Sequence, residues 1–260
     1  MLSSPRSRPR CYRQIVTLIA VCLAAWPAPV LAFRPFDGTD AAVADEGEME
    51  IEFQPVGALW ERGQTTLIAP ATRLNIGLAK DWEAVLEGQL QTPLWPPGPT
   101  SLSASGFFLK HVLRRGSLQD QSGISLATEF GVLLPDTNGD SRFGASIAGI
   151  ASQRWDWGAI HLNAAAALTR EHRADVFIGT IVEGPATWTL RPVAEVFYEE
   201  EFGQAHTVSG LIGAIWKVRD DLSFDIGFRH AVTNSHSVNE IRGGVTFSFP
   251  YRAFRGSSYR

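Results

Sequence analysis

Apolar and polar residues alternate in many short segments downstream of the N-terminal region. In 222–230, the apolar residues Leu222, Phe224, Ile226 and Phe228 occupy even positions, and polar residues or glycine occupy the odd positions. Successive side chains of a strand point to opposite faces, so this pattern predicts a strand with one apolar and one polar face. The same alternation in 158–169 and 82–91 predicts a chain built of such strands.

This alternation suits both a soluble β-sandwich and a membrane β-barrel, because each has one apolar face. We favour an all-β fold, an antiparallel up-and-down transmembrane β-barrel of about 12 strands. Ten and fourteen strands are the alternatives, because 66–78 and 104–114 alternate less regularly than the other segments. The expected strands are 48–60, 66–78, 82–92, 104–114, 122–134, 143–154, 158–169, 174–183, 187–199, 206–217, 221–231 and 238–249.

The segments that connect these strands favour the barrel. Most even-numbered connections are tight, as at 79–81 and 219–220, although 116–121 is longer. The odd-numbered connections are longer or more polar, as at 93–103 and 233–237. Bacterial barrels have short periplasmic turns and longer external loops, so we expect both chain ends on the periplasmic side.

The N-terminal residues predict export. Residues 1–13 contain four arginines and no acid, an apolar run covers 15–26, and a small residue, Ala32, follows. This is the pattern of a cleaved signal peptide. Cys11 and Cys22 would be removed with it, so we expect no disulfide and no cysteine metal site.

The expected organisation is a signal peptide at 1–32, a periplasmic tail or short plug at 33–46, a barrel at 47–250 and a C-terminal extension at 251–260. The expected location is the bacterial outer membrane, with its lipid and the outer-membrane assembly machinery as partners. Removal of four arginines makes the formal charge of −4 more negative, which argues against nucleic acid as a partner.

The start of the predicted mature chain carries a family resemblance. Arg34-Pro35, then Thr39-Asp40, then Gly47 with Glu50 and Glu52 in a Gly-x-x-Glu-x-Glu order lead into the first strand. This opening resembles the "putative MetA-pathway of phenol degradation" family of outer-membrane proteins, although Ala41 stands where that family often has a second Asp. The resemblance implies a small, transporter-like barrel linked to uptake of aromatic or other hydrophobic compounds.

Charged residues on the polar strand faces are expected to line the lumen. A narrow barrel must fill its interior, so these charges either pair across strands and plug the barrel or flank an open path. We expect Glu48, Glu50 and Glu52 to face water. The candidate lumen residues are Arg73, Glu83, Glu87, Lys110, Glu129, His161, Arg191, Glu195, Asp225, Arg229, Glu240 and Arg242.

Aromatic residues concentrate near the predicted strand ends. Amphipathic rings prefer the headgroup level of a membrane, so this placement predicts two interfacial girdles. The candidate interfacial residues are Trp60, Trp82, Trp155, Trp157, Trp188, Trp216 and Phe249.

Three functional classes fit such a barrel. The first is a channel or transporter for passive passage of a small solute, with hydrophobic or aromatic compounds as candidates. The second is a structural or interaction barrel that presents the loops 93–103 and 135–142. The third, ranked last, is a lipid-modifying enzyme, for which the nearest candidates are His230, His236, Ser237 and Glu240. However, His236 and Ser237 are adjacent and would point to opposite faces of a strand, and His230 lies at a loop.

We expect no cofactor and no metal site. The loop at 136–140 has an Asp-x-Asn-x-Asp spacing that suits calcium. However, Ser141 stands where the calcium loop turns through glycine, and no closing acid follows. A polar turn is therefore the preferred interpretation.

Overall fold

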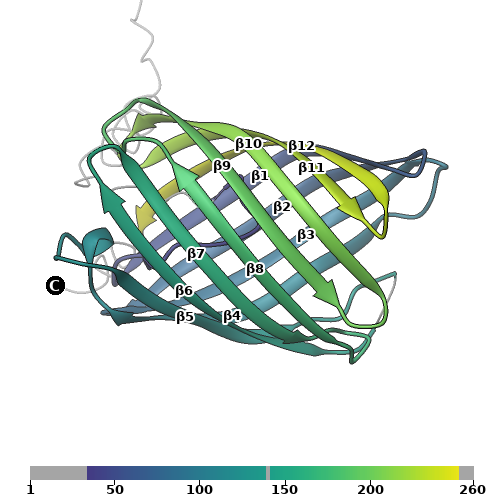
Figure 1. Cartoon of the computed structure of the whole chain (residues 1–260), viewed down its shortest axis with the longest axis horizontal. Helices are drawn as coiled ribbons and strands as arrows, with labels where there is room; N and C mark the ends of the chain where they lie inside the picture. The colour runs from purple at the N-terminus through teal and green to yellow at the C-terminus, as the bar shows by residue number, and fades with distance from the viewer. Residues whose placement is uncertain (1–33, 139–140, 252–260) are drawn as a thin grey trace, which may run out of the picture.

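The computed structural model describes residues 34–138 and 141–251, and the predicted signal peptide lies outside these residues. Twelve antiparallel strands form a closed barrel, because β1 pairs with both β2 and β12 (Figure 1). The predicted twelve-stranded barrel is confirmed. The strands are β1 (Glu48–Glu61), β2 (Gln64–Ala79), β3 (Trp82–Trp95), β4 (Ser101–Arg114), β5 (Ser125–Leu133), β6 (Gly144–Trp155), β7 (Gly158–Leu168), β8 (Ala174–Glu183), β9 (Leu190–Glu201), β10 (Ala205–Arg219), β11 (Leu222–Thr233) and β12 (His236–Pro250).

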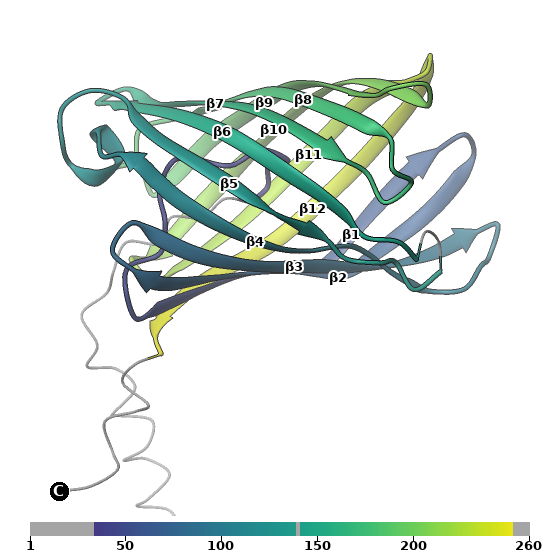
Figure 2. The same cartoon turned by 90° about the horizontal axis from the view of Figure 1, so that it is seen from below.

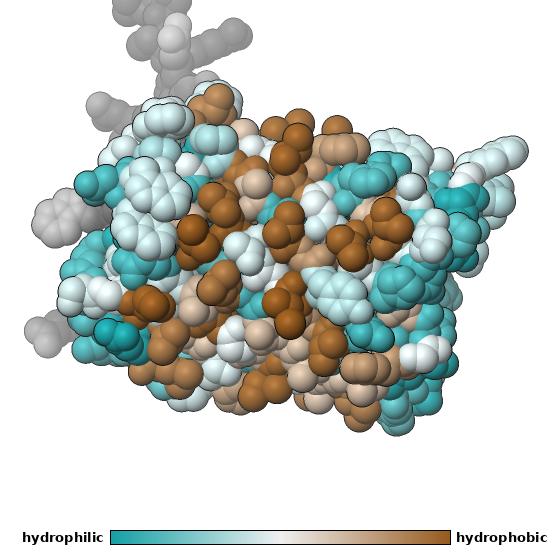
Figure 3. All heavy atoms as spheres, viewed as in Figure 1, coloured by the Kyte–Doolittle hydropathy of each residue, from teal (hydrophilic) through white to brown (hydrophobic). Residues whose placement is uncertain are grey.

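The apolar strand faces point outwards and the polar faces point into the barrel. Ile226 is 56 % exposed, whereas its neighbour Asp225 is 7 % exposed. On the face that Figure 3 shows, apolar side chains gather across the middle and polar residues cover the two ends. In the part of the chain that the structure describes, no helix has both the length and the apolar character needed to cross a membrane.

The connections do not sort by length as the sequence predicts. We call the end where β1 begins and β12 ends the terminal end, and the opposite end the far end. The connections 115–124 and 134–143 are equally long and lie at opposite ends. At the far end, the predicted longer connection at 233–237 is a tight turn of Asn234 and Ser235, which have φ values of 47° and 68°. Asparagine tolerates this left-handed conformation, and such turns fit the twist of a hairpin.

Irregular pairing bends the wall formed by β1 to β4. Pro55 in β1 and Pro70 in β2 each lie at a shift in strand register, where a residue need not donate a backbone N–H to the sheet. A further shift follows Glu87 in β3, and Ala104 in the partner strand has a φ of 49°. Bulges of this kind bend a strand and redirect its side chains. This bent stretch of wall therefore departs from a regular barrel and leaves room inside it.

The predicted interfacial aromatics are not divided equally between the two ends. Only Trp60 lies near the far end, together with the exposed Trp95, which was not among the candidates. Trp155 and Trp157 stack with ring centroids 5.2 Å apart at the terminal end, where Trp82 also stacks on His111 at 4.1 Å. The remaining candidates at the terminal end are Trp188, Trp216 and Phe249.

The outward apolar face gives a prediction about stability. The change Ile212→Arg, at the centre of β10 and 66 % exposed, should lower the free energy of unfolding in lipid vesicles by about 2–4 kcal/mol, because it puts a charge into hydrocarbon. Urea unfolding followed by tryptophan fluorescence measures this loss. The control Gln204→Arg, in the connection 202–204, should change stability by less than about 0.5 kcal/mol. Equal losses in the two variants would show that this face does not contact lipid.

Candidate functional site

The barrel holds its own N-terminal segment, residues 34–47, inside the lumen. Figure 2 shows this part of the chain running within the ring of strands from the start of β1. Ala41 is fully buried, and Thr39, Asp40 and Ala42 are buried with it. Because the lumen is narrow, the contacts between this segment and the wall define the candidate site.

Wall side chains accept hydrogen bonds from the backbone of the N-terminal segment. The Glu195 carboxylate of β9 accepts two consecutive N–H groups, from Asp37 at 2.8 Å and from Gly38 at 2.7 Å. The next N–H group, of Thr39, donates to Asn163 Oδ1 of β7 at 3.0 Å. Buried backbone groups need such partners, so the wall supplies what a neighbouring strand would otherwise give.

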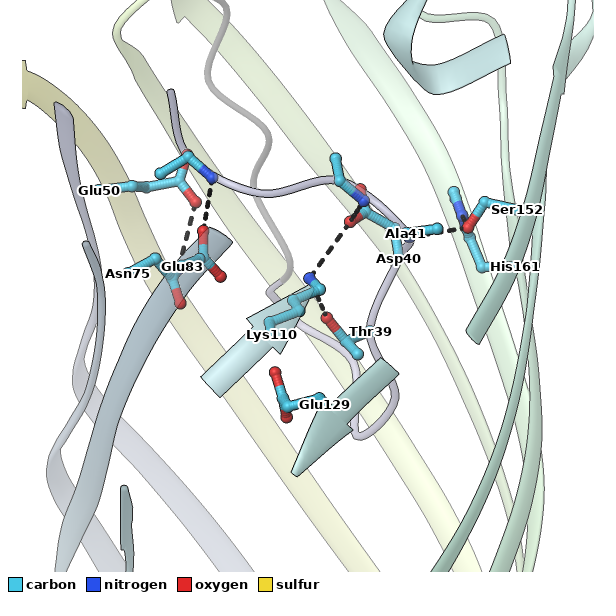
Figure 4. A network of polar contacts seen from close by, with 12 residues as sticks. Thr39, Asp40, Ala41, Glu50, Asn75, Glu83, Lys110, Glu129, Ser152 and His161 are labelled. Carbon is cyan, nitrogen blue, oxygen red and sulfur yellow. Dashed lines mark hydrogen bonds and ion pairs between the residues drawn. The ribbon is translucent and has the colours of Figure 1, made fainter. Parts of the chain in front are cut away.

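The same kind of recognition continues towards the terminal end. The Ala41 N–H donates to Ser152 Oγ of β6 at 2.9 Å, and the Ala44 N–H donates to Glu83 Oε2 of β3 at 2.5 Å. Figure 4 shows the contact between Ala41 and Ser152 as part of a polar network. The N-terminal segment is therefore bound along its length by strands from different sides of the barrel.

Two ion pairs hold Asp37 and Asp40, which are two of the four acidic residues of the segment. The Arg242 guanidinium of β12 lies 2.9 Å from the Asp37 carboxylate, and it also donates to the Pro35 carbonyl at 2.9 Å. Burial by itself raises the pKa of Asp37, but Arg242 and two further arginines outweigh this effect and hold the pKa below its usual value. Lys110 of β4 lies 3.6 Å from the Asp40 carboxylate (Figure 4). Both acids therefore have cationic partners on the wall.

Glycines in the wall make space for the segment. A Cβ on Gly77 of β2 would lie 1.9 Å from the Asp45 carbonyl oxygen, so any side chain there would collide with the segment. A Cβ on Gly244 of β12 would lie 2.4 Å from Arg34 Nε. Arg34 itself lies 3.6 Å from Asp225 of β11. Gly244 therefore leaves no open space in the lumen, because the N-terminal segment fills it.

The connection between β4 and β5 closes over the segment at the terminal end. It contains a short 3₁₀-helix, η1 (Ser117–Gln119). Leu118 packs against the buried Ala41, and Gln119 Nε2 donates to the Ala41 carbonyl at 2.9 Å. This connection therefore holds the segment in place from the terminal end of the barrel.

The remaining lumen charges pair with one another. Arg73 of β2 binds Glu87 at 2.7 Å and Glu129 at 2.6 Å, which ties β2, β3 and β5 together. Glu240 of β12 binds Arg229 at 2.6 Å and Arg242 at 2.9 Å. Arg73 and Arg229 pair with glutamates of other strands, and Arg242 pairs with a glutamate of its own strand, so much of the interior charge is neutralised locally.

All of the predicted lumen residues lie on the inner face, where they are buried or half-buried. The expectation that Glu50 and Glu52 face water is wrong. They are 7 % and 2 % exposed and lie beside Asn75, which donates to Glu52 at 2.7 Å. The error arises because the polar face of β1 turns towards a filled lumen. The predicted lumen residues that contact the N-terminal segment directly are Glu83, Lys110, Glu195, Asp225 and Arg242.

A series of Ser, His and Glu side chains lies beneath the N-terminal segment. His161 Nδ1 lies 2.8 Å from Ser152 Oγ, and its Nε2 lies 3.2 Å from Glu183, which also binds Arg191 at 2.9 Å. The order resembles that of hydrolytic triads. However, the Ser152 hydroxyl accepts the Ala41 N–H and is buried, so this series supports the segment. Residues 230–240, proposed for an enzyme, do not converge either, because His230 bonds Asn239 on the outer face while Glu240 points inwards.

Two cavities flank the N-terminal segment. The inner cavity, towards the terminal end, has a volume of about 410 Å³ and is lined by more carboxylates than cations. The outer cavity, towards the far end, has a volume of about 390 Å³ and is lined by the bent stretch of β1 to β4. Glu52 and Arg73 line both cavities, so these two side chains lie where the cavities approach each other.

Sequence reasoning missed the acceptors Asn163 and Ser152. Both occupy inward positions of regular strands, but short polar residues are common on any lumen face. Gly77 was the available signal, because a glycine in a strand interior often marks the close approach of another backbone. Its partner segment could not be identified without the three-dimensional structure.

Comparison with known proteins finds similarity in fold. No family profile and no curated protein sequence matches the chain. The COG4313 outer membrane channel from Pseudomonas putida F1 aligns with a TM-score of 0.56 at 9 % identity, over 82 % of this chain and 100 % of that one. The KdgM porin gives 0.51 at 9 % identity, over 77 % and 99 %. The β domain of the Bordetella autotransporter BrkA gives 0.50 at 13 % identity, over 79 % and 100 %. At such low identity these matches show a shared barrel fold.

The contact at Gly77 gives a prediction about the N-terminal segment. The change Gly77→Val should displace the segment, because a side chain there meets the Asp45 carbonyl. In an Ala41→Cys background, in which the mature chain has a single thiol, reaction with a membrane-impermeant maleimide should become at least about tenfold faster.

The matched control is Gly149→Val, since a Cβ on Gly149 of β6 meets no atom within 4 Å. This control should leave the introduced thiol as protected as it is in the Ala41→Cys parent. If Gly77→Val also left the thiol protected, the segment would not depend on the space at Gly77.

Proposed function

We propose that this chain is a bacterial outer-membrane channel for passive passage of small solutes, and that its N-terminal segment controls the opening. The observation that carries the proposal is the pair of cavities on either side of the segment, which share Glu52 and Arg73 as lining residues. A displacement of the segment would join them into one path through the barrel. The path would follow the β1 to β4 side, where the bulges give the wall extra room.

The contacts that hold the N-terminal segment would allow it to move without disruption of the sheet. Gly47, at the end of the segment, bonds to the backbone of Gly77 in β2, whereas wall side chains hold the backbone N–H groups of Asp37, Gly38, Thr39 and Ala41. Individual hydrogen bonds contribute about 0.5–1.5 kcal/mol each, so a segment held in this way can leave its site while the closed sheet stays intact. The apolar outer band supports placement in a membrane.

The opening of the mature chain supports membership of the MetA-pathway family, and hence an aromatic or hydrophobic solute. Phe36, Leu59 and Ile68 in the lining of the outer cavity suit such a solute. Most other lining residues are polar or charged, which favours solutes that also carry polar groups. A purely structural barrel is the competing function, since the closed lumen in this structure would serve it equally well.

A disulfide that holds the segment in place tests the proposal. A Cβ on Gly38 would lie 3.2 Å from Asn163 Cγ, so thiols in the Gly38→Cys/Asn163→Cys variant are close enough to bond. In planar bilayers, the oxidised variant should show at least about tenfold fewer channel openings than after reduction. Each single variant should respond to neither oxidant nor reductant.

The two outcomes separate the channel from the structural barrel. Discrete conductance steps that appear on reduction and disappear on oxidation support the proposal. A folded, heat-modifiable protein that never conducts, in the wild type or in the reduced variant, would reject transport and leave the structural role.

A further inference from the structure

The part of the N-terminal segment at mid-lumen is bound as a peptide ligand would be. Residues 37–40, Asp-Gly-Thr-Asp, make contacts through main chain and side chains together. The Glu195 carboxylate takes two successive N–H groups and Asn163 takes the third. Such contacts recognise a peptide backbone that bends at Asp37 and Gly38 and turns two successive N–H groups to the same side, since they would form with any residue types that fit the space.

Side-chain contacts add a selection for carboxylates three residues apart. Arg242 binds the first of them, on Asp37, at 2.9 Å. Lys110 lies 3.6 Å from the second, on Asp40, and donates to the Thr39 hydroxyl at 3.1 Å. Charged hydrogen bonds of this kind are stronger than neutral ones, so the two cations set the charge pattern of the occupant.

Close packing restricts the second position of the occupant. A Cβ on Gly38 would lie 3.0 Å from Asn163 Nδ2 and 3.1 Å from Glu195 Oε1. Both side chains already bind backbone N–H groups, so they cannot move away without loss of those bonds. The site therefore favours glycine at this position.

We propose that the site around Glu195, Asn163, Arg242 and Lys110 is the channel's solute site, and that its solutes are short peptides of the pattern Asp-Gly-x-Asp that bend as residues 37–40 do. The N-terminal segment occupies this site as an intramolecular ligand and is exchanged for the solute. This inference rests on the proposed channel function, but it names an acidic peptide in place of the aromatic or hydrophobic solute that the family resemblance implies. It also explains why side chains that accept backbone N–H groups and cationic side chains lie at the same level of the lumen.

The test uses the full mature chain with Asp37→Asn and Asp40→Asn, which weaken the internal ligand and leave the wall unchanged. Isothermal titration calorimetry in detergent micelles measures binding of the peptide acetyl-Asp-Gly-Thr-Asp-amide. We expect this peptide to bind at least about tenfold more tightly than acetyl-Asn-Gly-Thr-Asn-amide, because each lost carboxylate removes a charged partner. Acetyl-Asp-Val-Thr-Asp-amide should also bind at least about tenfold more weakly, because its side chain meets the Glu195 and Asn163 atoms.

A wall variant identifies the second carboxylate contact. Adding Lys110→Met should weaken binding of the Asp-Gly-Thr-Asp peptide about tenfold and weaken binding of an Asp-Gly-Thr-Asn peptide by less, because the second peptide loses only the hydrogen bond to its Thr hydroxyl. If the double Asn variant fails to fold, Gly77→Val opens the segment from its other end and serves as the host for the same titrations.

Three outcomes would overturn the inference: absence of peptide binding in both hosts, equal binding of the Asp and Asn peptides, or equal binding of a neutral tetrasaccharide. Conductance recorded on the same variants keeps the two proposals separate. A variant that conducts without binding the peptide rejects the peptide site and retains the channel. A variant that binds the peptides in the expected order without conducting supports the peptide site and rejects transport.

Discussion

The pairing of β1 with β12 is the constraint on which the rest of the structure depends. Backbone N–H and C=O groups have no water to bind in the hydrocarbon of a membrane, so a sheet that faces lipid must close on itself. Closure then separates the two strand faces completely. The apolar face meets the surroundings, and every polar side chain of the other face is confined to one narrow lumen.

Because these polar side chains are confined, the charges in the lumen need partners. The wall and the N-terminal segment supply partners to each other. Arg242 is the clearest example, because it binds Glu240 within its own strand, Asp37 of the segment and the Pro35 carbonyl. Burial of a charge is costly unless it is paired and hydrogen-bonded. The segment thus contributes acids where the wall has cations, and N–H groups where the wall has acceptors such as Glu195.

The shape of the wall and the position of the segment are complementary in a similar way. The bulges of β1 to β4 open space on one side, which the outer cavity occupies, while glycines such as Gly77 and Gly244 admit the segment. Barrels of this size occur in a porin, an outer-membrane channel and an autotransporter β domain, so the fold alone does not decide function. What distinguishes this chain is the set of side chains that hold its own backbone in the lumen.

The sequence by itself determined the strands and their faces. Side chains of a strand alternate between two faces, and apolar and polar residues alternate with the same two-residue period in 222–230 and in the other predicted strands. It also predicted which charged residues share the inner face, since parity along a strand decides this. Tertiary structure decided the rest. Which charge meets which depends on register around the closed ring, as for Arg73 with Glu129, and turn length at Asn234 depends on local φ values. The N-terminal segment has no periodic pattern, so only the three-dimensional structure could place it against Glu195, Asn163 and Ser152.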